Sequence, residues 1–207
     1  MRAVNENLKL QNPFGAHIAD RTKFYCLIET HGSNNDHDRS KIEKLFDKLV
    51  GDKLCSDVVM AENSGQILNI WSLRERIAEA LTKDGFNYKY DISLPLDSIY
   101  QLVIDLRERL KNESVLRCIG YGHLGDGNLH LNLTTKEFNP SAFKLIEPFV
   151  YEWAKQKNGS ISAEHGLGSR KRDYIYYSKP KEAVQLMKLL KNTWDPNHIL
   201  NPYKTLP

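Results

Sequence analysis

A tight turn between two strand-like runs is the feature that most constrains the fold of this chain. Asp126-Gly127 is typical of hairpin turns, and alternating polar and apolar residues flank it. A turn centred on this dipeptide pairs His123 with His130 across two antiparallel strands. Side chains that face each other in this way have Cβ atoms about 5 Å apart, so two imidazoles can share one cation.

The second strand of this hairpin places its residues on two different faces. Alternation puts His130 and Asn132 on one face and three leucines on the other, namely Leu129, Leu131 and Leu133. The leucines predict a face buried in the core. The imidazole and the amide predict a face that carries chemistry, with Asn132 placed to contact whatever binds beside the histidines.

A later segment adds a carboxylate and a further imidazole, Glu164 and His165. His123, His130 and Glu164 leave open positions on a divalent ion, which is the arrangement of a catalytic rather than a closed structural site. Each residue alone is typical of an ordinary hairpin or turn, so the prediction depends on their combination. Neighbours in a strand point to opposite sides, and we therefore interpret His165 as a general base rather than a ligand.

Periodicity along the chain predicts strands that alternate with helices. The expected strands are Lys23–Thr30, Ser56–Ala61, Tyr88–Leu94, the hairpin within Val115–Thr135, and Ser160–Ala163. The expected helices are Asp38–Val50, Gln66–Leu81, one that Asp97 caps, Ser141–Lys157 and Glu182–Trp194. The helix that Asp97 caps has an expected apolar stripe of Ile99, Leu102, Val103, Leu106 and Leu110. This order favours a single α+β unit: a ferredoxin-like antiparallel sheet covered by helices, with a helical C-terminal tail over Lys179–Pro207 that packs on the sheet or on a neighbour.

Composition excludes several classes of function. The net charge of +3 is too small to predict a nucleic-acid partner without a clustered basic face, and no apolar run is long enough to cross a bilayer. The basic cluster Arg170-Lys171-Arg172 is either a solvated turn or lies near anionic ligand or cofactor groups. Widely spaced cysteines predict reduced core thiols rather than disulfides; they are Cys26, Cys55 and Cys118.

Two cationic residues lie outside these motifs, on an expected helix and the strand after it. Arg74 shares a helical face with Ala78 by its spacing, and Lys89 follows on the next strand. An arginine fork and a lysine suit a carboxylate substrate. Taken alone, both residues are more typical of solvated surface charges.

Together these motifs resemble the C-terminal part of the FAD-linked oxidases related to vanillyl-alcohol oxidase. The hairpin resembles the wider D-lactate and glycolate oxidase family, and the segments around Arg74 and Lys89 resemble its D-2-hydroxyglutarate dehydrogenase branch. The resemblance covers nearly all of the chain. It rests on Phe24–Thr30, Trp71–Ile77, Tyr88–Pro95, Gly120–His130, Ser162–Gly166 and Asn201–Pro207.

The resemblance implies a role for each residue of the cluster. His123, His130 and Glu164 would hold zinc or a similar divalent ion, and His165 would be the catalytic base that also contacts the substrate. The implied reaction oxidises D-2-hydroxyglutarate to 2-oxoglutarate, with proton transfer to His165 and hydride transfer to FAD.

The resemblance also assigns the substrate contacts. Arg74 and Lys89 would clamp the distal carboxylate, and Asn132 would contact the substrate. Two positions depart from the family pattern. Ala78 replaces a threonine that binds substrate, and His198 replaces a glycine in a turn where a positive φ is expected.

FAD in this family is bound mainly by a separate domain that precedes this region. The resemblance adds only weak FAD contacts from Asn201 and Lys204, an electron-transfer flavoprotein as acceptor, and a mitochondrial location. The segment Met1–Pro13 has the character of neither a secretory signal nor an Arg-rich transit peptide. We therefore expect an N-terminally truncated substrate- and metal-binding domain, from a fragment, a short isoform or an incomplete gene model.

Two other functions are compatible with the same motifs. The chain could be a non-catalytic module that binds a metal and a 2-hydroxyacid without the flavin domain. It could also be a metal-dependent hydrolase in which His165 activates a metal-bound water. Three outcomes distinguish these functions. A dehydrogenase shows flavin-coupled turnover, a binding module binds without turnover, and a hydrolase cleaves esters or amides without flavin.

Overall fold

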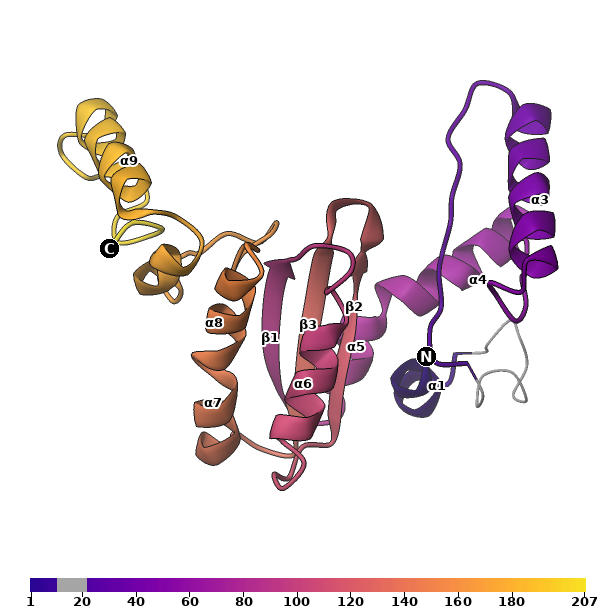
Figure 1. Cartoon of the computed structure of the whole chain (residues 1–207), viewed down its shortest axis with the longest axis horizontal. Coiled ribbons are helices and arrows are strands. Elements are labelled where there is room, and N and C mark those ends of the chain that lie inside the picture. Colours follow the sequence, from indigo (N-terminus) through magenta and orange to yellow (C-terminus); the bar gives the residue numbers. More distant parts are fainter. Residues whose placement is uncertain (11–21) are drawn as a thin grey trace. The chain divides into compact units, whose positions relative to one another are not determined.

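The computed structural model describes residues 1–10 and 22–207, and the chain divides into two compact units, Met1–Lys83 and Asp84–Pro207 (Figure 1). Each unit is described here by itself. The first is helical among its described residues. The second contains the sheet and most of the residues that the sequence singles out.

The first unit consists of α1 (Arg2–Leu8), α3 (Asn35–Gly51), α4 (Ser64–Glu75) and α5 (Ile77–Thr82). Asparagine caps begin the two longer helices: the side chain of Asn34 accepts from the backbone N–H of His37, and that of Asn63 accepts from Gln66. Helix α1 packs against α5, where the Asn7 amide donates to the carbonyl of Ala80 at 2.8 Å.

Three expectations for this unit are wrong or need adjustment. The segments Lys23–Thr30 and Ser56–Ala61 form no strand, because they find no hydrogen-bonded neighbour within the described part of the chain. The expected helix Gln66–Leu81 is two helices that meet at Arg76, whose ψ of 12° departs from helical geometry. The i, i+4 argument that gave Arg74 and Ala78 one face therefore does not hold.

The second unit is built on an antiparallel sheet of β1 (Phe86–Ser93), β2 (Arg117–His123) and β3 (Asn128–Thr135), in the order β1-β3-β2. Helix α6 (Gln101–Arg109) connects β1 to β2, and α7 (Pro140–Ile146) and α8 (Phe149–Gln156) follow β3. An isolated antiparallel bridge joins Ser160 to Ser93 on the other edge of β1, so the expected strand Ser160–Ala163 is reduced to one bridge. The βαββα order, followed by the bridging segment at Ser160, confirms the α+β class with an antiparallel sheet of ferredoxin-like character.

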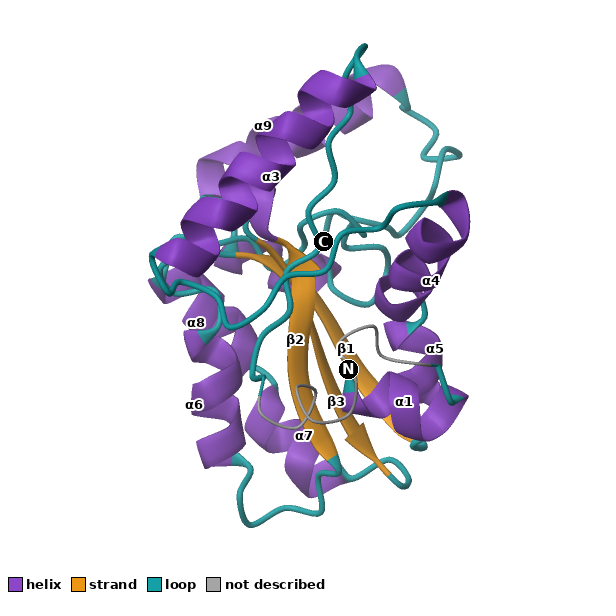
Figure 2. Cartoon of the chain, turned by 90° about the vertical axis from the view of Figure 1, so that its right-hand side faces the viewer, coloured by secondary structure: helices purple, strands orange, loops and turns teal. Residues whose placement is uncertain are grey.

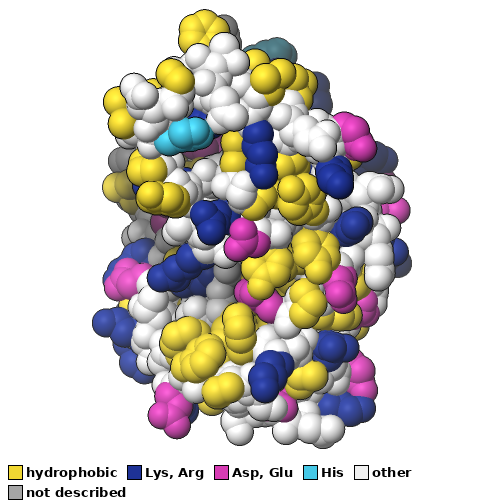
Figure 3. Space-filling view, turned by 90° about the vertical axis from the view of Figure 1, so that its left-hand side faces the viewer, with side chains coloured by type: hydrophobic (Ala, Val, Ile, Leu, Met, Phe, Trp, Pro, Cys, Tyr) yellow, Lys and Arg dark blue, Asp and Glu magenta, His cyan; other side chains and the backbone are white. Residues whose placement is uncertain are grey.

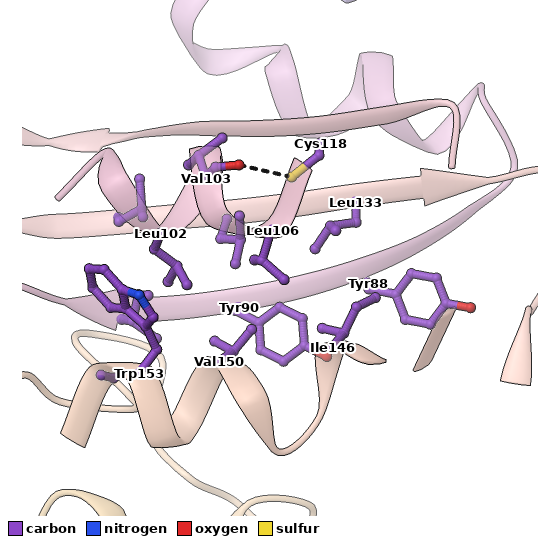
Figure 4. Packing of buried hydrophobic residues seen from close by; sticks show 14 of the residues in the cluster. Tyr88, Tyr90, Leu102, Val103, Leu106, Cys118, Leu133, Ile146, Val150 and Trp153 are labelled. Atoms are coloured by element: carbon purple, nitrogen blue, oxygen red, sulfur yellow. Dashed lines mark hydrogen bonds between the residues drawn. The ribbon is translucent and has the colours of Figure 1, made fainter. Parts of the chain in front are cut away.

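The core of this unit lies between one face of the sheet and α6, α7 and α8 (Figures 2 and 4). Alternate residues of the strands point into it: Tyr88, Tyr90 and Ile92 from β1, and Leu129, Leu131 and Leu133 from β3. Burial of each such side chain contributes about 1.5–3 kcal/mol to stability. The expected apolar stripe of α6 is confirmed for Leu102, Val103, Leu106 and Leu110, which are buried, whereas Ile99 is half-buried in the turn before the helix.

Helix boundaries in this unit differ from the sequence expectation at two points. Asp97 does not cap α6, which begins at Gln101 after a turn. The expected helix Ser141–Lys157 is split at Glu147-Pro148, because proline has no N–H to continue the helical ladder. Glu147 at the break accepts hydrogen bonds from the hydroxyls of Tyr90 (2.7 Å) and Tyr151 (3.2 Å).

The hairpin has the expected faces but a different register. Its loop is a short 3-10 turn, η1 (Leu124–Asp126), followed by Gly127 at φ +70°, so His123 pairs with Asn128 rather than with His130. Asp126 fixes this loop by accepting from the backbone N–H of Asn128 at 3.1 Å. The shift is two residues, and side chains repeat every two residues in a strand, so His123 and His130 stay on one face.

The C-terminal part contains η2 (Arg172–Tyr177) and α9 (Lys181–Trp194), which pack against each other rather than placing α9 on the sheet. Val184 is buried, whereas several apolar side chains of α9 and of the residues after it are exposed: Leu186, Leu189, Leu190, Trp194, Ile199, Leu200 and Tyr203. Figure 3 shows hydrophobic side chains interspersed with Lys and Arg on the face that it displays. His198 adopts φ +52°, as expected for a position usually held by glycine. Within the described residues, no helix combines the length and apolar character that a bilayer crossing requires.

All three cysteines are free thiols, as expected. Only Cys118 lies in the core; Cys55 is half-buried and Cys26 is exposed, so the prediction of core thiols is wrong for Cys26 and Cys55. Cys26 belongs to the segment that was expected to be a strand, and its burial depended on that strand.

Candidate metal and acid–base site

The sheet face opposite the helices carries a row of polar side chains that comes from all three strands. In this row Asp91 of β1 pairs with His130 of β3, and His130 pairs with Tyr121 of β2. The next row pairs Lys89 with Asn132. These five residues lie side by side because β3 pairs with β1 on one edge and with β2 on the other.

Two ligand atoms form the centre of the candidate site. His130 Nε2 lies 3.2 Å from Glu164 Oε1, and His123 Nε2 lies 4.0 Å from the same oxygen. The imidazoles of His123 and His130 meet edge to face, with centroids 5.5 Å apart. His130 is buried, whereas His123 and Glu164 are exposed, so the centre opens on one side to solvent.

His165 also belongs to this cluster. Its Nε2 lies 3.6 Å from Glu164 Oε1, and its ring stacks on that of His130 at 5.4 Å and 19°. Residues 163–165 form a bend and not a strand, so the argument that Glu164 and His165 point to opposite sides does not hold. Proximity alone does not divide the roles of ligand and base between the histidines.

Asp91 is a member of the cluster that the sequence reasoning missed. Its carboxylate is 2 % exposed, and Oδ2 accepts backbone N–H groups from Ala163 (3.1 Å), Glu164 (2.9 Å) and His165 (2.8 Å). Burial by itself would raise the pKa of Asp91, but backbone hydrogen bonds from His165 and Glu164, together with attraction to the imidazoles of His165 and His130, hold that pKa below its usual range. One signal was available, because aspartate is disfavoured in strands and this one interrupts a β-rich run.

The residues expected to bind substrate are only partly brought together. Asn132 is buried and accepts from the side chain of Asn87 at 3.1 Å, while Lys89, its register partner, is exposed. Arg74 lies at the end of α4 and Ala78 on α5, both in the first unit. The expected pair of Arg74 with Lys89 thus joins residues of different units and stays a prediction.

The basic triplet divides into exposed and enclosed members. Arg170 is exposed, whereas Lys171 is half-buried, with its Nζ 5.9 Å from the centre of the Tyr90 ring. Burial lowers the pKa of Lys171, and attraction to Asp91 and Glu147 opposes this effect. Lys171 is therefore half-buried beside Tyr90, and the interpretation as a solvated turn fails for it.

Asn201 and Lys204, the expected FAD contacts, lie together in the C-terminal tail. Both are exposed, and Lys204 Nζ donates to Asn201 Oδ1 at 3.2 Å. Their contact with FAD stays a prediction.

The donor set fits a divalent cation. Asp91, His130, Glu164 and His165 each offer one oxygen or nitrogen, and these atoms lie within 4.8 Å of one another. Donors bound about 2.0–2.1 Å from a tetrahedral zinc are roughly 3.4 Å apart, close to the 3.2 Å and 3.6 Å separations at Glu164. Imidazole and carboxylate ligands of this kind are typical of zinc. His123, an expected ligand, is not one of these four residues; its Nε2 lies 4.0 Å from Glu164 Oε1.

A comparison with protein-family models shows which family the chain belongs to. The model of the C-terminal domain of FAD-linked oxidases matches residues 1–205. The chain belongs to the FAD-linked oxidases. Within this family, the match covers both units and all of the residues of the candidate site.

Relatives of this FAD-linked oxidase chain are similar over most of its length. It is 50% identical over its whole length to the mitochondrial D-2-hydroxyglutarate dehydrogenase of Danio rerio, and 50% identical over 92% of it to that of Arabidopsis thaliana. It is 46% identical over 90% of its length to a putative mitochondrial D-lactate dehydrogenase of Schizosaccharomyces pombe. The chain spans only 38%, 34% and 38% of these relatives, respectively.

Proposed function

We propose that this chain supplies the substrate- and metal-binding part of a mitochondrial, flavin-dependent dehydrogenase that oxidises D-2-hydroxyglutarate to 2-oxoglutarate. The observation that carries the proposal is the convergence of His130 Nε2, Glu164 Oε1 and His165 Nε2 on one sheet face, with separations of 3.2 Å and 3.6 Å from Glu164. The names of the relatives and the shared family model support the substrate and the flavin.

Each side chain has a distinct task in the proposed mechanism. His123, His130 and Glu164 hold the cation. When bound, that cation polarises the 2-hydroxyl and FAD accepts the hydride from C2. His165 takes the hydroxyl proton on Nε2, the atom that faces Glu164, so the C2–H and O–H bonds break as the carbonyl forms.

The row next to the histidines orients the rest of the substrate. Lys89 and Asn132 are register partners two residues from Asp91 and His130 along their strands, which is about 7 Å. We propose that Lys89 attracts the distal carboxylate of the substrate, that Arg74 is the second group of this clamp, and that Asn132 contacts the substrate near the cation. A five-carbon diacid is long enough to join two neighbouring rows.

The test joins this chain to the FAD-binding part of the Danio rerio relative and measures dye reduction. We expect reduction with D-2-hydroxyglutarate, and loss of about 100-fold or more in kcat for His165→Asn with little change in substrate affinity. His37→Asn, an exposed histidine of α3, is the control. A chimera that holds FAD and zinc but reduces no dye would contradict the proposal.

A calorimetric titration of the chain itself separates the dehydrogenase from a binding module. Zinc and D-2-hydroxyglutarate are titrated into wild-type chain. Binding of both without turnover in the flavin-loaded chimera favours the non-catalytic module. Absence of zinc binding contradicts the candidate site as a whole.

A further inference from the structure

Asp91 occupies a position where a carboxylate requires an explanation. It lies within β1 and is 2 % exposed, and although it belongs to the cluster of four donor residues, the proposed mechanism gives it no role as ligand, base or substrate contact. A buried carboxylate is costly unless it is hydrogen-bonded or paired, and aspartate is disfavoured in strands. Its two oxygens contact two different parts of the site.

One oxygen fixes the bend that carries Glu164 and His165. Oδ2 accepts the N–H groups of three consecutive residues, Ala163, Glu164 and His165, at 2.8–3.1 Å. Successive amides that converge on one anion form a rigid concave arrangement and fix the direction of the side chains they carry. Because three donors already use this oxygen, it is poorly suited to bind a cation directly.

The other oxygen faces His130. Oδ1 lies 3.6 Å from His130 Nδ1, slightly beyond hydrogen-bond length, and among the described residues this buried oxygen has no hydrogen-bond partner. A metal-binding histidine usually gives its second ring N–H to a carboxylate or carbonyl, which fixes the tautomer and directs the other nitrogen at the metal. In His130 that other nitrogen, Nε2, faces Glu164 at 3.2 Å.

We infer that Asp91 is a positioning residue, which orients the ligands of the cation site without binding the cation. Its Oδ1 holds the proton of His130 on Nδ1, which leaves Nε2 as a ligand. Its Oδ2 fixes Glu164 and His165 through their backbone N–H groups. This inference rests on the proposed cation site. Through one side chain of β1, the hairpin and the bend after α8 are joined at the place where their ligands meet. Asp91 acts through its neighbours and does not bind the cation itself.

The variant Asp91→Asn separates this role from simple support of the fold. The amide oxygen of asparagine can accept from the three N–H groups, and its NH₂ group then faces His130 Nδ1. That nitrogen must become an acceptor, which moves the ring proton to Nε2 and removes the lone pair that binds the cation. We expect zinc affinity to fall about 10- to 100-fold in titration calorimetry, with cooperative unfolding retained.

Asp195→Asn is a matched control. Asp195 is also a buried aspartate that accepts from backbone amides of a bend, those of Ile199 (3.0 Å) and Leu200 (3.1 Å), and it pairs with Lys191. It contacts none of the candidate ligands in the described structure. We expect its replacement to leave zinc affinity within about twofold of wild type.

The tautomer of His130 is measured directly in wild-type chain without zinc, by ¹⁵N NMR of the histidine rings at about pH 8, where an ordinary imidazole is neutral. We expect protonated Nδ1 in wild type and protonated Nε2 in Asp91→Asn. A fold-supporting role alone would leave the tautomer unchanged. Protonated Nε2 in wild type overturns the inference, even if Asp91→Asn fails to fold.

The outcomes also separate this inference from the proposed function. Wild-type chain that binds no zinc contradicts the cation site, while the tautomer still tests the contact with Asp91. Wild type and Asp91→Asn that bind zinc equally overturn the role of Asp91 alone.

Discussion

The rings of His123 and His130 meet edge to face at 5.5 Å and 82°, although the two residues are not partners in the strand ladder. His123 pairs with Asn128, and His130 pairs with Tyr121. The imidazoles meet diagonally, across a distance that aromatic and long side chains can reach.

This relationship predicts that both imidazoles contribute to zinc binding. Replacement of His123 or His130 by alanine removes a ligand, so zinc affinity should fall more than about 100-fold. This loss is larger than that expected when a residue that only hydrogen-bonds to a ligand is replaced. Titration calorimetry of each variant measures the effect, with His37→Ala of α3 as the control for loss of a histidine. Affinity equal to wild type for His123→Ala would exclude that residue as a ligand.

The close approach of β2 to β3 predicts a sharp difference between two glycines of the hairpin. A Cβ at Gly122 would lie 2.1 Å from the carbonyl oxygen of Asn128, whereas one at Gly125 would meet nothing within 4 Å. Gly122→Ala should lower the free energy of unfolding by about 1–3 kcal/mol and weaken zinc binding, because the strands must separate beside His123. Gly125→Ala should be nearly neutral.

Urea unfolding of both variants measures this difference. Equal stabilities for the two alanine variants would contradict the tight approach of the strands at Gly122.

The backbone of His198 predicts opposite effects of two substitutions. At φ +52° a side chain with a Cβ is strained, a β-branched one most of all, whereas glycine adopts this conformation readily. We expect His198→Gly to leave the free energy of unfolding unchanged or raise it by up to about 1 kcal/mol, and His198→Val to lower it by about 1–2 kcal/mol. Thermal unfolding measures both, and valine tolerated as well as glycine would argue against this turn.

Burial raises the pKa of the Cys118 thiol to about 11 from 9.0, against the opposing charge of Arg107. A raised pKa in the folded state means that folding favours the neutral thiol. The stability that the buried neutral thiol contributes is therefore fully present below about pH 9 and is lost as the pH rises toward 11. The stability of wild type relative to Cys118→Ala should fall by about 2 kcal/mol across that window. Urea unfolding at several pH values measures it.

Cys26→Ala removes an exposed thiol and is the control for loss of a cysteine. A stability difference between wild type and Cys118→Ala that stays constant with pH would contradict this prediction.

The sequence predicted the sheet well where alternation and turn chemistry agreed. The faces of β3 and the stripe of α6 follow directly from where leucine, histidine and valine fall. The segments Lys23–Thr30 and Ser56–Ala61 have the same residue preferences but form no strand, because a strand also needs a neighbour and local sequence does not specify one. The predicted register of the hairpin was wrong because the chain already turns at Leu124–Asp126, one position earlier than a turn centred on Asp126-Gly127.

The site was predictable through its reactive side chains and not through their support. Histidine and glutamate beside glycine attract notice in a sequence, whereas Asp91 stands out only when its distant neighbours are known. Its three amide donors lie more than 70 positions away, and no local pattern links them to β1.

Strand β3 is hydrogen-bonded along both edges; one of its faces packs in the core, and the other carries residues of the candidate site. Loss or gain of a single residue within it would turn leucines outward and imidazole inward at every later position. The length of this segment is therefore under stricter constraint than the identity of most residues in it, and tolerated insertions belong in the loops at its ends.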